Sequence, residues 1–172
     1  YKRTLPVTSS SAPLIRKMPR LRNTGTMVAG RVANNTGARF PTSGFNNSGI
    51  GSNAWTTPSN ITAADTNYAT PSAKPTNYLV GTGYGFSIPS DAIITGVVAT
   101  GRWYINQSGD TYRARLWNGS SATVDESISS SLTFPSSFAG FFATSVGSST
   151  NLWGATLTPA IINSSTFGVA VD

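Results

Sequence analysis

Hydrophobic and polar positions divide this chain into two unlike regions. Beyond about residue 50, short runs rich in Val, Ile, Thr and aromatic residues recur every eight to twelve residues or so, with turn-forming residues between them. The clearest alternation covers residues 111–117, where Tyr112 and Leu116 share one face and Arg113 lies on the other. This spacing predicts an all-β fold, specifically an antiparallel β-sandwich of the jelly-roll type.

Individual strands are predicted from β-branched and aromatic runs that are bounded by turn residues. Asn118-Gly119 is typical of a hairpin turn, and Gly81, Gly83 and Gly85 indicate bulges or close backbone approach. No long stretch carries the period of an amphipathic helix. The predicted strands cover residues 77–88, 92–105, 111–117, 121–128, 130–134, 138–146, 155–158 and 166–171.

The first 50 residues show neither period. Four prolines are spread along them, and proline removes a backbone donor and favours extended geometry in the residue before it. We therefore expect two parts, an extended N-terminal arm at residues 1–50 and a sandwich domain at residues 51–172. A chain of 172 residues is long enough for one such domain with a hydrophobic core.

Charge separates nearly the same two regions. Residues 1–64 hold eight cations and no acid, a net charge of +8, whereas residues 65–172 hold four cations and six acids, a net charge of −2. A near-neutral domain therefore carries a cationic arm. We predict that this arm binds the partners of the protein. Its cationic residues are Lys2, Arg3, Arg16, Lys17, Arg20, Arg22, Arg31 and Arg39.

Two kinds of partner suit such an arm. A basic cluster can bind nucleic acid by releasing counterions from phosphates, and arginines can also pair with acidic groups on a neighbouring protein. The densest cluster, residues 16–22, has four cations, is interrupted by Pro19 and contains no aromatic residue. We favour protein docking over genome binding for this reason.

The chain has no histidine and no cysteine, which excludes imidazole and thiolate catalysis and zinc sites built from those ligands. Lys74 precedes a proline in a predicted loop, where a solvated lysine is expected. Asp65 and Asn67 suit an Asx turn better than a calcium site, because calcium takes several oxygen ligands. We expect no catalytic residue, no cofactor and no metal, and therefore no enzyme.

Membrane insertion is not expected either. The longest apolar runs are about five or six residues, far short of the roughly 20 that a spanning helix needs. The chain opens at Tyr1 without the charged and apolar segments of a signal peptide.

Several motifs are more specific than composition. They are Trp55-Thr-Thr-Pro58, Asp65-Thr-Asn-Tyr-Ala-Thr70, Tyr84-Gly-Phe-Ser-Ile-Pro89, Leu152-Trp-Gly-Ala-Thr-Leu-Thr-Pro159 and Phe167-Gly-Val-Ala-Val171. With them the chain resembles a β-sandwich domain of tailed-phage and other virion structural proteins. The resemblance covers about residues 53–172 and leaves the arm unexplained. It implies a particle component, such as a capsid-decoration protein, a neck or tail accessory, or a fibre, and it brings no catalytic residue.

These observations predict a non-enzymatic virion structural protein, a capsid-decoration or minor capsid protein or a tail-neck accessory, that assembles through its arm. Its partners would be other virion proteins or copies of itself, giving a homo-oligomer within a larger assembly. One alternative is a carbohydrate-binding or host-adhesion module at the cell surface, which predicts an exposed Trp or Tyr beside polar side chains. Another is a subunit of an extracellular filament. A hydrolase is disfavoured because no plausible base is present.

Overall fold

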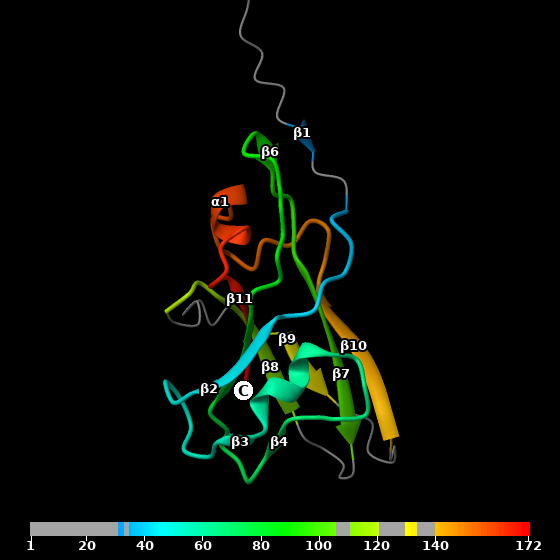
Figure 1. Ribbon diagram of the computed structural model, residues 1–172, viewed down its shortest axis with the longest axis vertical. Helices are drawn as coiled ribbons and strands as arrows, with labels where there is room; N and C mark the ends of the chain where they lie inside the picture. The colour runs from blue at the N-terminus through cyan, green and yellow to red at the C-terminus, as the bar shows by residue number, and fades with distance from the viewer. Residues whose placement is uncertain (1–30, 33–34, 106–110, 121–129, 134–139) are drawn as a thin grey trace, which may run out of the picture.

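The computed structural model describes residues 31–32, 35–105, 111–120, 130–133 and 140–172, and the side chains of residues 35–103, 112–120 and 143–172. Short strands dominate it, with one single-turn α-helix and one 3-10 helix, so the predicted all-β class is confirmed (Figure 1). The helices are η1 (Pro58–Thr62) and α1 (Pro159–Ile162). The strands are β1 (Arg31–Val32), β2 (Ser43–Asn47), β3 (Trp55–Thr56), β4 (Thr70–Pro71), β5 (Tyr78–Thr82), β6 (Ala92–Ile93), β7 (Val98–Ile105), β8 (Thr111–Trp117), β9 (Ser130–Thr133), β10 (Gly140–Gly147) and β11 (Gly168–Val171).

The largest sheet has five strands in the order β2-β5-β11-β8-β9, and every neighbouring pair is antiparallel. Its central strand is β11, the last in the sequence, which pairs with β5 on one side and β8 on the other. The backbones approach closely there: a Cβ at Gly168 would lie 2.0 Å from the carbonyl oxygen of Gly81. The close approach predicted at Gly81 is thereby confirmed.

A second antiparallel sheet pairs β7 with β10 over eight residues. Both sheets contribute to one hydrophobic core, in which Leu116 from β8 and Val146 from β10 belong to the same cluster. The core also takes in side chains from the connecting segments, because short strands by themselves bury too little apolar surface. Its buried members are Trp55, Leu79, Ile88, Ala92, Tyr112, Ala114, Leu116, Val146, Trp153, Ile162 and Phe167.

The opposite face of the five-stranded sheet carries a smaller buried cluster of Tyr78, Val80, Trp117 and Ala170. Successive residues of a strand point to opposite faces, which is why Trp117 and its neighbour Leu116 belong to different clusters. Trp117 meets Tyr78 edge to face, with ring centroids 6.4 Å apart. The five-stranded sheet is therefore packed on both faces.

Two asparagine side chains join segments that the sheets do not. The Asn46 amide accepts from the backbone N–H of Trp55 and donates to its carbonyl oxygen, both at 2.7 Å. The Asn163 amide does the same at Ile88, with both distances at 2.8 Å. Each amide thus satisfies both the backbone donor and the backbone acceptor of a residue in another segment.

Several strand predictions hold closely. Residues 111–117 form β8 over the predicted range, and strands lie within 130–134 and 166–171 and across most of 138–146. The range 121–128 lies outside the described residues.

Other expectations were wrong. The predicted strand at 77–88 ends at Thr82, because Gly83 adopts a left-handed φ of 76° and turns the chain. The stretch 92–105 is divided into β6 and β7, and 155–158 is not a strand but leads into α1. Asn118-Gly119 does not close a tight hairpin, since the partner of β8 begins at Ser130.

The boundary between arm and domain falls earlier in the structure than residue 50. Strand β2 lies within the range assigned to the arm, yet it pairs with β5 as the edge of the five-stranded sheet. Residues 1–30 and 33–34 of the predicted arm lie outside the described part of the chain.

Candidate functional site

The predicted partner-binding residues fall into two groups. Lys2, Arg3, Arg16, Lys17, Arg20 and Arg22 lie outside the described residues. Arg31 belongs to β1, whose backbone pairs in parallel with β6, in the register Arg31 to Ala92 and Val32 to Ile93. Arg39 is exposed on the segment that leads from β1 to the sheet. Of the predicted partner-binding residues, the structure therefore describes only Arg31 and Arg39, at the junction between the arm and the domain.

Pro41 and Thr42 hold this junction against the five-stranded sheet. Pro41 is buried. Thr42 donates two hydrogen bonds, from its backbone N–H to the carbonyl oxygen of Thr82 at 2.9 Å and from its hydroxyl to the carbonyl oxygen of Gly83 at 3.0 Å. On the N-terminal side of this point, residues 35–40 are all exposed. The chain is therefore anchored to the domain at Pro41 and Thr42, is exposed over residues 35–40, and meets the domain again where β1 pairs with β6.

Four large apolar side chains are exposed on the segment before Pro41, on β6, at the start of β7 and on α1. Phe40 is 57% exposed, Ile93 of β6 is 55% exposed and Val98 at the start of β7 is 53% exposed. Ile161 of α1 is exposed as well, and Figure 1 shows α1, β6 and β1 at the same upper end of the molecule. We refer to these exposed side chains, Phe40, Ile93, Val98 and Ile161, together as the arm-side end.

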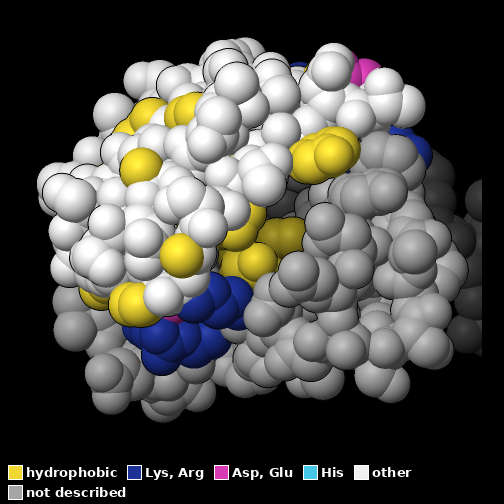
Figure 2. All heavy atoms as spheres, turned by 90° about the horizontal axis from the view of Figure 1, so that it is seen from below, with side chains coloured by type: hydrophobic (Ala, Val, Ile, Leu, Met, Phe, Trp, Pro, Cys, Tyr) yellow, Lys and Arg dark blue, Asp and Glu magenta, His cyan; other side chains and the backbone are white. Residues whose placement is uncertain are grey.

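The opposite end of the molecule carries a basic recess of about 170 Å³, lined by Ile50, Lys74, Pro75, Thr76, Arg113 and Asp172. Figure 2 views the molecule from this end and shows lysine and arginine side chains gathered next to hydrophobic ones at a hollow. Three of the four cations of residues 65–172 lie in or beside the recess, since Arg115 shares an acid with Arg113.

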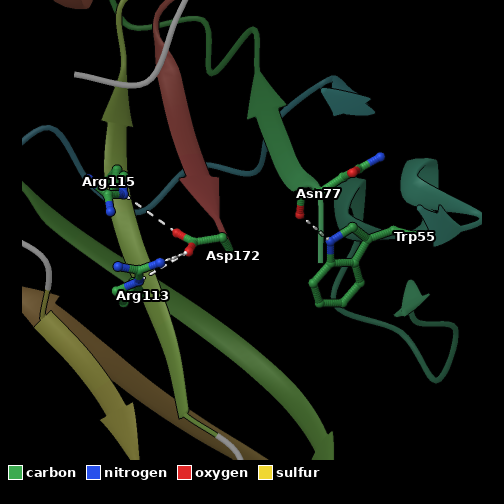
Figure 3. A network of polar contacts seen from close by, with 5 residues as sticks. All are labelled: Trp55, Asn77, Arg113, Arg115 and Asp172. Atoms are coloured by element: carbon green, nitrogen blue, oxygen red, sulfur yellow. Dashed lines mark hydrogen bonds and ion pairs between the residues drawn. The ribbon is translucent and has the colours of Figure 1, made fainter. Parts of the chain in front are cut away.

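Asp172 forms ion pairs with both Arg113 and Arg115. Its carboxylate accepts from Arg113 Nε at 3.0 Å and Nη2 at 2.5 Å, and from Arg115 Nε at 3.5 Å (Figure 3). The backbones of Asp172 and Arg113 also exchange two hydrogen bonds, which continue the β8–β11 ladder. Arg115 and the carboxylate are buried whereas Arg113 is half exposed. The carboxylate therefore neutralises a buried guanidinium, which is a structural role.

Lys74 is exposed, as predicted, and in addition it contacts an aromatic group. Its Nζ lies 3.9 Å from the centroid of the Tyr112 ring. Tyr112 in turn stacks on Trp103 at 5.3 Å and packs against Trp55 at 5.9 Å. The lysine thus sits over the rim of the aromatic core, a favourable position for a cation.

Trp55 of this core is held by a hydrogen bond from its indole ring. Its indole Nε1 donates to the carbonyl oxygen of Asn77 at 2.9 Å in a buried hydrogen bond (Figure 3). Trp153 similarly donates from Nε1 to the Val97 carbonyl at 2.9 Å. Trp55, Trp117 and Trp153 are all buried, so most of the tryptophans fill the interior.

The predicted Asx turn is confirmed. Asp65 Oδ1 accepts from the backbone N–H of Asn67 at 2.8 Å, and Oδ2 accepts from its side-chain amide at 2.9 Å. These hydrogen bonds lower the pKa of the exposed Asp65 carboxyl, with a smaller contribution from the charge of Arg102. Among the described residues, no three acidic, histidine or cysteine side chains come together as metal ligands.

No family model, curated protein or solved structure matches this chain. In the part of the chain that the structure covers, no helix is long and apolar enough to cross a bilayer. A functional proposal therefore depends on this chain's own residues and on the sequence motifs noted above.

Proposed function

We propose that this chain is a structural protein of a virion, a capsid-decoration or minor capsid protein or a tail-neck accessory, and not an enzyme. Its domain would be an antiparallel β-sandwich of the jelly-roll type that joins the particle through the N-terminal arm. The observation that carries the proposal is the exit of the chain at Pro41 into a fully exposed segment, beyond which most of the positive charge lies.

The core supports the sandwich part of this proposal. Two antiparallel sheets contribute to one hydrophobic cluster, which is how the inner faces of a sandwich are buried. The motifs on which the proposed resemblance to virion sandwich domains rests include Trp55 and Phe167, and both side chains are buried in that cluster. The resemblance therefore concerns residues that shape the core, and it supports a particle component with the virion as its location.

Charge and geometry support the arm as the element of assembly. Residues 1–64 have a net charge of +8, whereas the rest of the chain is slightly acidic. An extended cationic segment can bury backbone and arginine contacts along a neighbouring protein, and repetition around a particle multiplies weak contacts. Other virion proteins and further copies of this chain are the partners we favour over the genome.

Truncation tests this proposal directly. A variant lacking residues 1–40 retains β2 and every later strand, so we expect a cooperative unfolding transition close to that of the full chain. Light scattering at increasing concentration should show association of the full chain and a monomeric truncation. If the truncated protein associates as strongly as the full chain, or the full chain stays monomeric, the proposal is wrong.

A matched control separates protein docking from nucleic-acid binding. Replacing Arg16, Lys17, Arg20 and Arg22 by glutamine removes four charges and keeps the length of the arm. If the arm binds nucleic acid, fluorescence anisotropy with DNA should show tight, salt-dependent binding that these changes abolish. Under our proposal such binding is weak at physiological salt, while association of the protein is retained without nucleic acid.

One side chain favours the second candidate, a carbohydrate-binding or host-adhesion module. Tyr68 is 43% exposed and follows Asp65 and Asn67 in an exposed loop. An exposed aromatic ring beside polar groups suits a sugar. Binding on a glycan array that disappears in Tyr68→Ala and persists in Tyr84→Phe would favour this function. The third candidate, a filament subunit, predicts that the purified chain polymerises unaided in electron micrographs.

A further inference from the structure

The contact between β1 and β6 is a small, self-contained joint. It comprises two residues on each strand and consists of backbone pairing in a parallel register. Within the described residues, β1 pairs with no strand of the five-stranded sheet. A backbone ladder of this kind depends little on which chain supplies the strand, because its hydrogen bonds join main-chain groups.

The segment after β1 is suited to a hinge. Residues 35–40 are all exposed, and the hydrogen bond recorded among them, from Gly37 N–H to Asn35 Oδ1, is local at 2.9 Å. Gly37 has a left-handed φ of 77° and would have nothing within 4 Å of a Cβ. Reorienting this segment therefore breaks few contacts with the domain, which stays anchored at Pro41 and Thr42.

The arm-side end also presents apolar surface around the joint. Ile93 belongs to β6 itself, and Phe40 closes the exposed segment, yet each is more than half exposed. Since a second copy carries the same side chains, two copies could bury them against each other in a symmetric, isologous contact.

We propose that β1 is exchanged between copies, so that β1 of one chain pairs with β6 of a second chain and the exposed side chains of the two arm-side ends meet. This deepens the proposed function and rests on it, because it names the partner of the arm at this joint as a second copy of the chain. The same two-residue register, Arg31 to Ala92 and Val32 to Ile93, forms across the two molecules.

Engineered cysteines test the exchange cleanly, because the chain has no cysteine of its own. Val32→Cys and Ile93→Cys are made in separate full-length chains, and one of them is labelled with a heavy isotope. After mixing and oxidation, mass spectrometry should find disulfide-linked peptides that join position 32 of one chain to position 93 of the other. Their yield should rise with protein concentration, by at least fivefold over a tenfold range.

A second pair of positions provides the control. Thr100 and Ser145 face each other across β7 and β10, with their hydroxyl oxygens 2.8 Å apart. Thr100→Cys and Ser145→Cys in one chain should give an internal link. The same two substitutions in separate chains should give no cross-link, since this pairing belongs to the folded domain. Equal yields for the two mixtures would mean random collision and would overturn the exchange.

Shortening the hinge gives an independent outcome. Deleting residues 36–39 removes up to about 14 Å of reach, so that β1 cannot return to β6 of its own chain. We expect the dimeric fraction measured by light scattering to rise at least fivefold, whereas inserting four Gly or Ser residues at the same place should lower it. A deletion variant that remains monomeric overturns the exchange.

The two proposals fail separately. If truncation of residues 1–40 abolishes association but links between position 32 and position 93 form only within one chain, the arm assembles the protein by another contact and the exchange is wrong. If those links form between chains while a variant lacking residues 1–30, which keeps β1, associates as strongly as the full chain, the exchange stands and the rest of the arm is not the element of assembly.

Discussion

The five-stranded sheet and the arm-side end of this molecule differ in how much apolar surface they bury. Around the five-stranded sheet, large side chains such as Trp153 and Leu116 are almost fully buried, and the Trp153 indole donates a hydrogen bond to the Val97 carbonyl. At the arm-side end, a two-residue ladder holds β1, and apolar side chains remain in water. The first arrangement stabilises the folded chain, whereas the second contributes little to its stability.

The comparison predicts its largest effect at Trp153, which is 2% exposed in the core. Trp153→Ala should lower the free energy of unfolding by about 3–5 kcal/mol, because it removes a large buried ring and the hydrogen bond to Val97. The measurement is urea unfolding followed by circular dichroism. Leu157→Ala, at a half-buried position, is the milder control. A loss below about 1 kcal/mol at Trp153 would contradict the assignment of this residue to the core.

The next effect concerns the buried acid. Asp172→Ala leaves the Arg115 guanidinium buried without its counter-charge, so we expect a loss of about 3 kcal/mol. Arg113→Ala removes a half-exposed partner of the same carboxylate and should change the free energy of unfolding by less than about 1 kcal/mol. The two variants are compared by the same denaturant titration. Equal losses would show that burial does not distinguish the two arginines.

Tyr84 lies in the segment between β5 and β6, between the two regions compared here. Burial raises the pKa of its phenol to about 12, and the ring stacks on Phe86 at 5.9 Å. Because the pKa is raised in the folded state, stability is full below pH 10 and is lost as pH rises from 10 towards 12. We expect Tyr84 to contribute at most about 3 kcal/mol of this loss.

Absorbance titration at alkaline pH measures this directly. Tyr84→Phe should remove the phenol that ionises near pH 12 and flatten the decline of the free energy of unfolding in that window. If the variant declines as steeply as the parent, the buried phenol is not the cause.

The smallest effect on stability is expected at the arm-side end. Ile93→Ser and Phe40→Ser alter exposed side chains and should shift the free energy of unfolding by less than about 0.5 kcal/mol. Under the proposed exchange they should nevertheless weaken association, which light scattering measures. A large loss of stability in either variant would mean that this end belongs to the core after all.

Local patterns were sufficient to predict some of this structure. The alternation in residues 111–117 predicted β8 and its two faces, because the side-chain period of a strand is a property of the backbone. Asp65 followed by Asn67 predicted an Asx turn for the same reason, since both hydrogen bonds lie within three residues. Thr, Val and aromatic content also predicted an all-β fold.

Partners distant in sequence could not be predicted in this way. Nothing near β11 indicates that it lies between β5 and β8, and Asn118-Gly119 resembles a hairpin turn although the partner strand begins at Ser130. The pairing of a strand depends on which other edges are available, and that is decided when the whole chain collapses around one core.

The sequence by itself determined the β class, the uneven distribution of charge and the absence of imidazole and thiol chemistry, since these follow from residue types and short-range geometry. Tertiary structure alone decided that Arg115 is buried against Asp172 and that Ser43–Asn47 belongs to the sheet. It also decided that β1 meets β6. These features need residues far apart in the chain to meet, and their free energy exists only once they do.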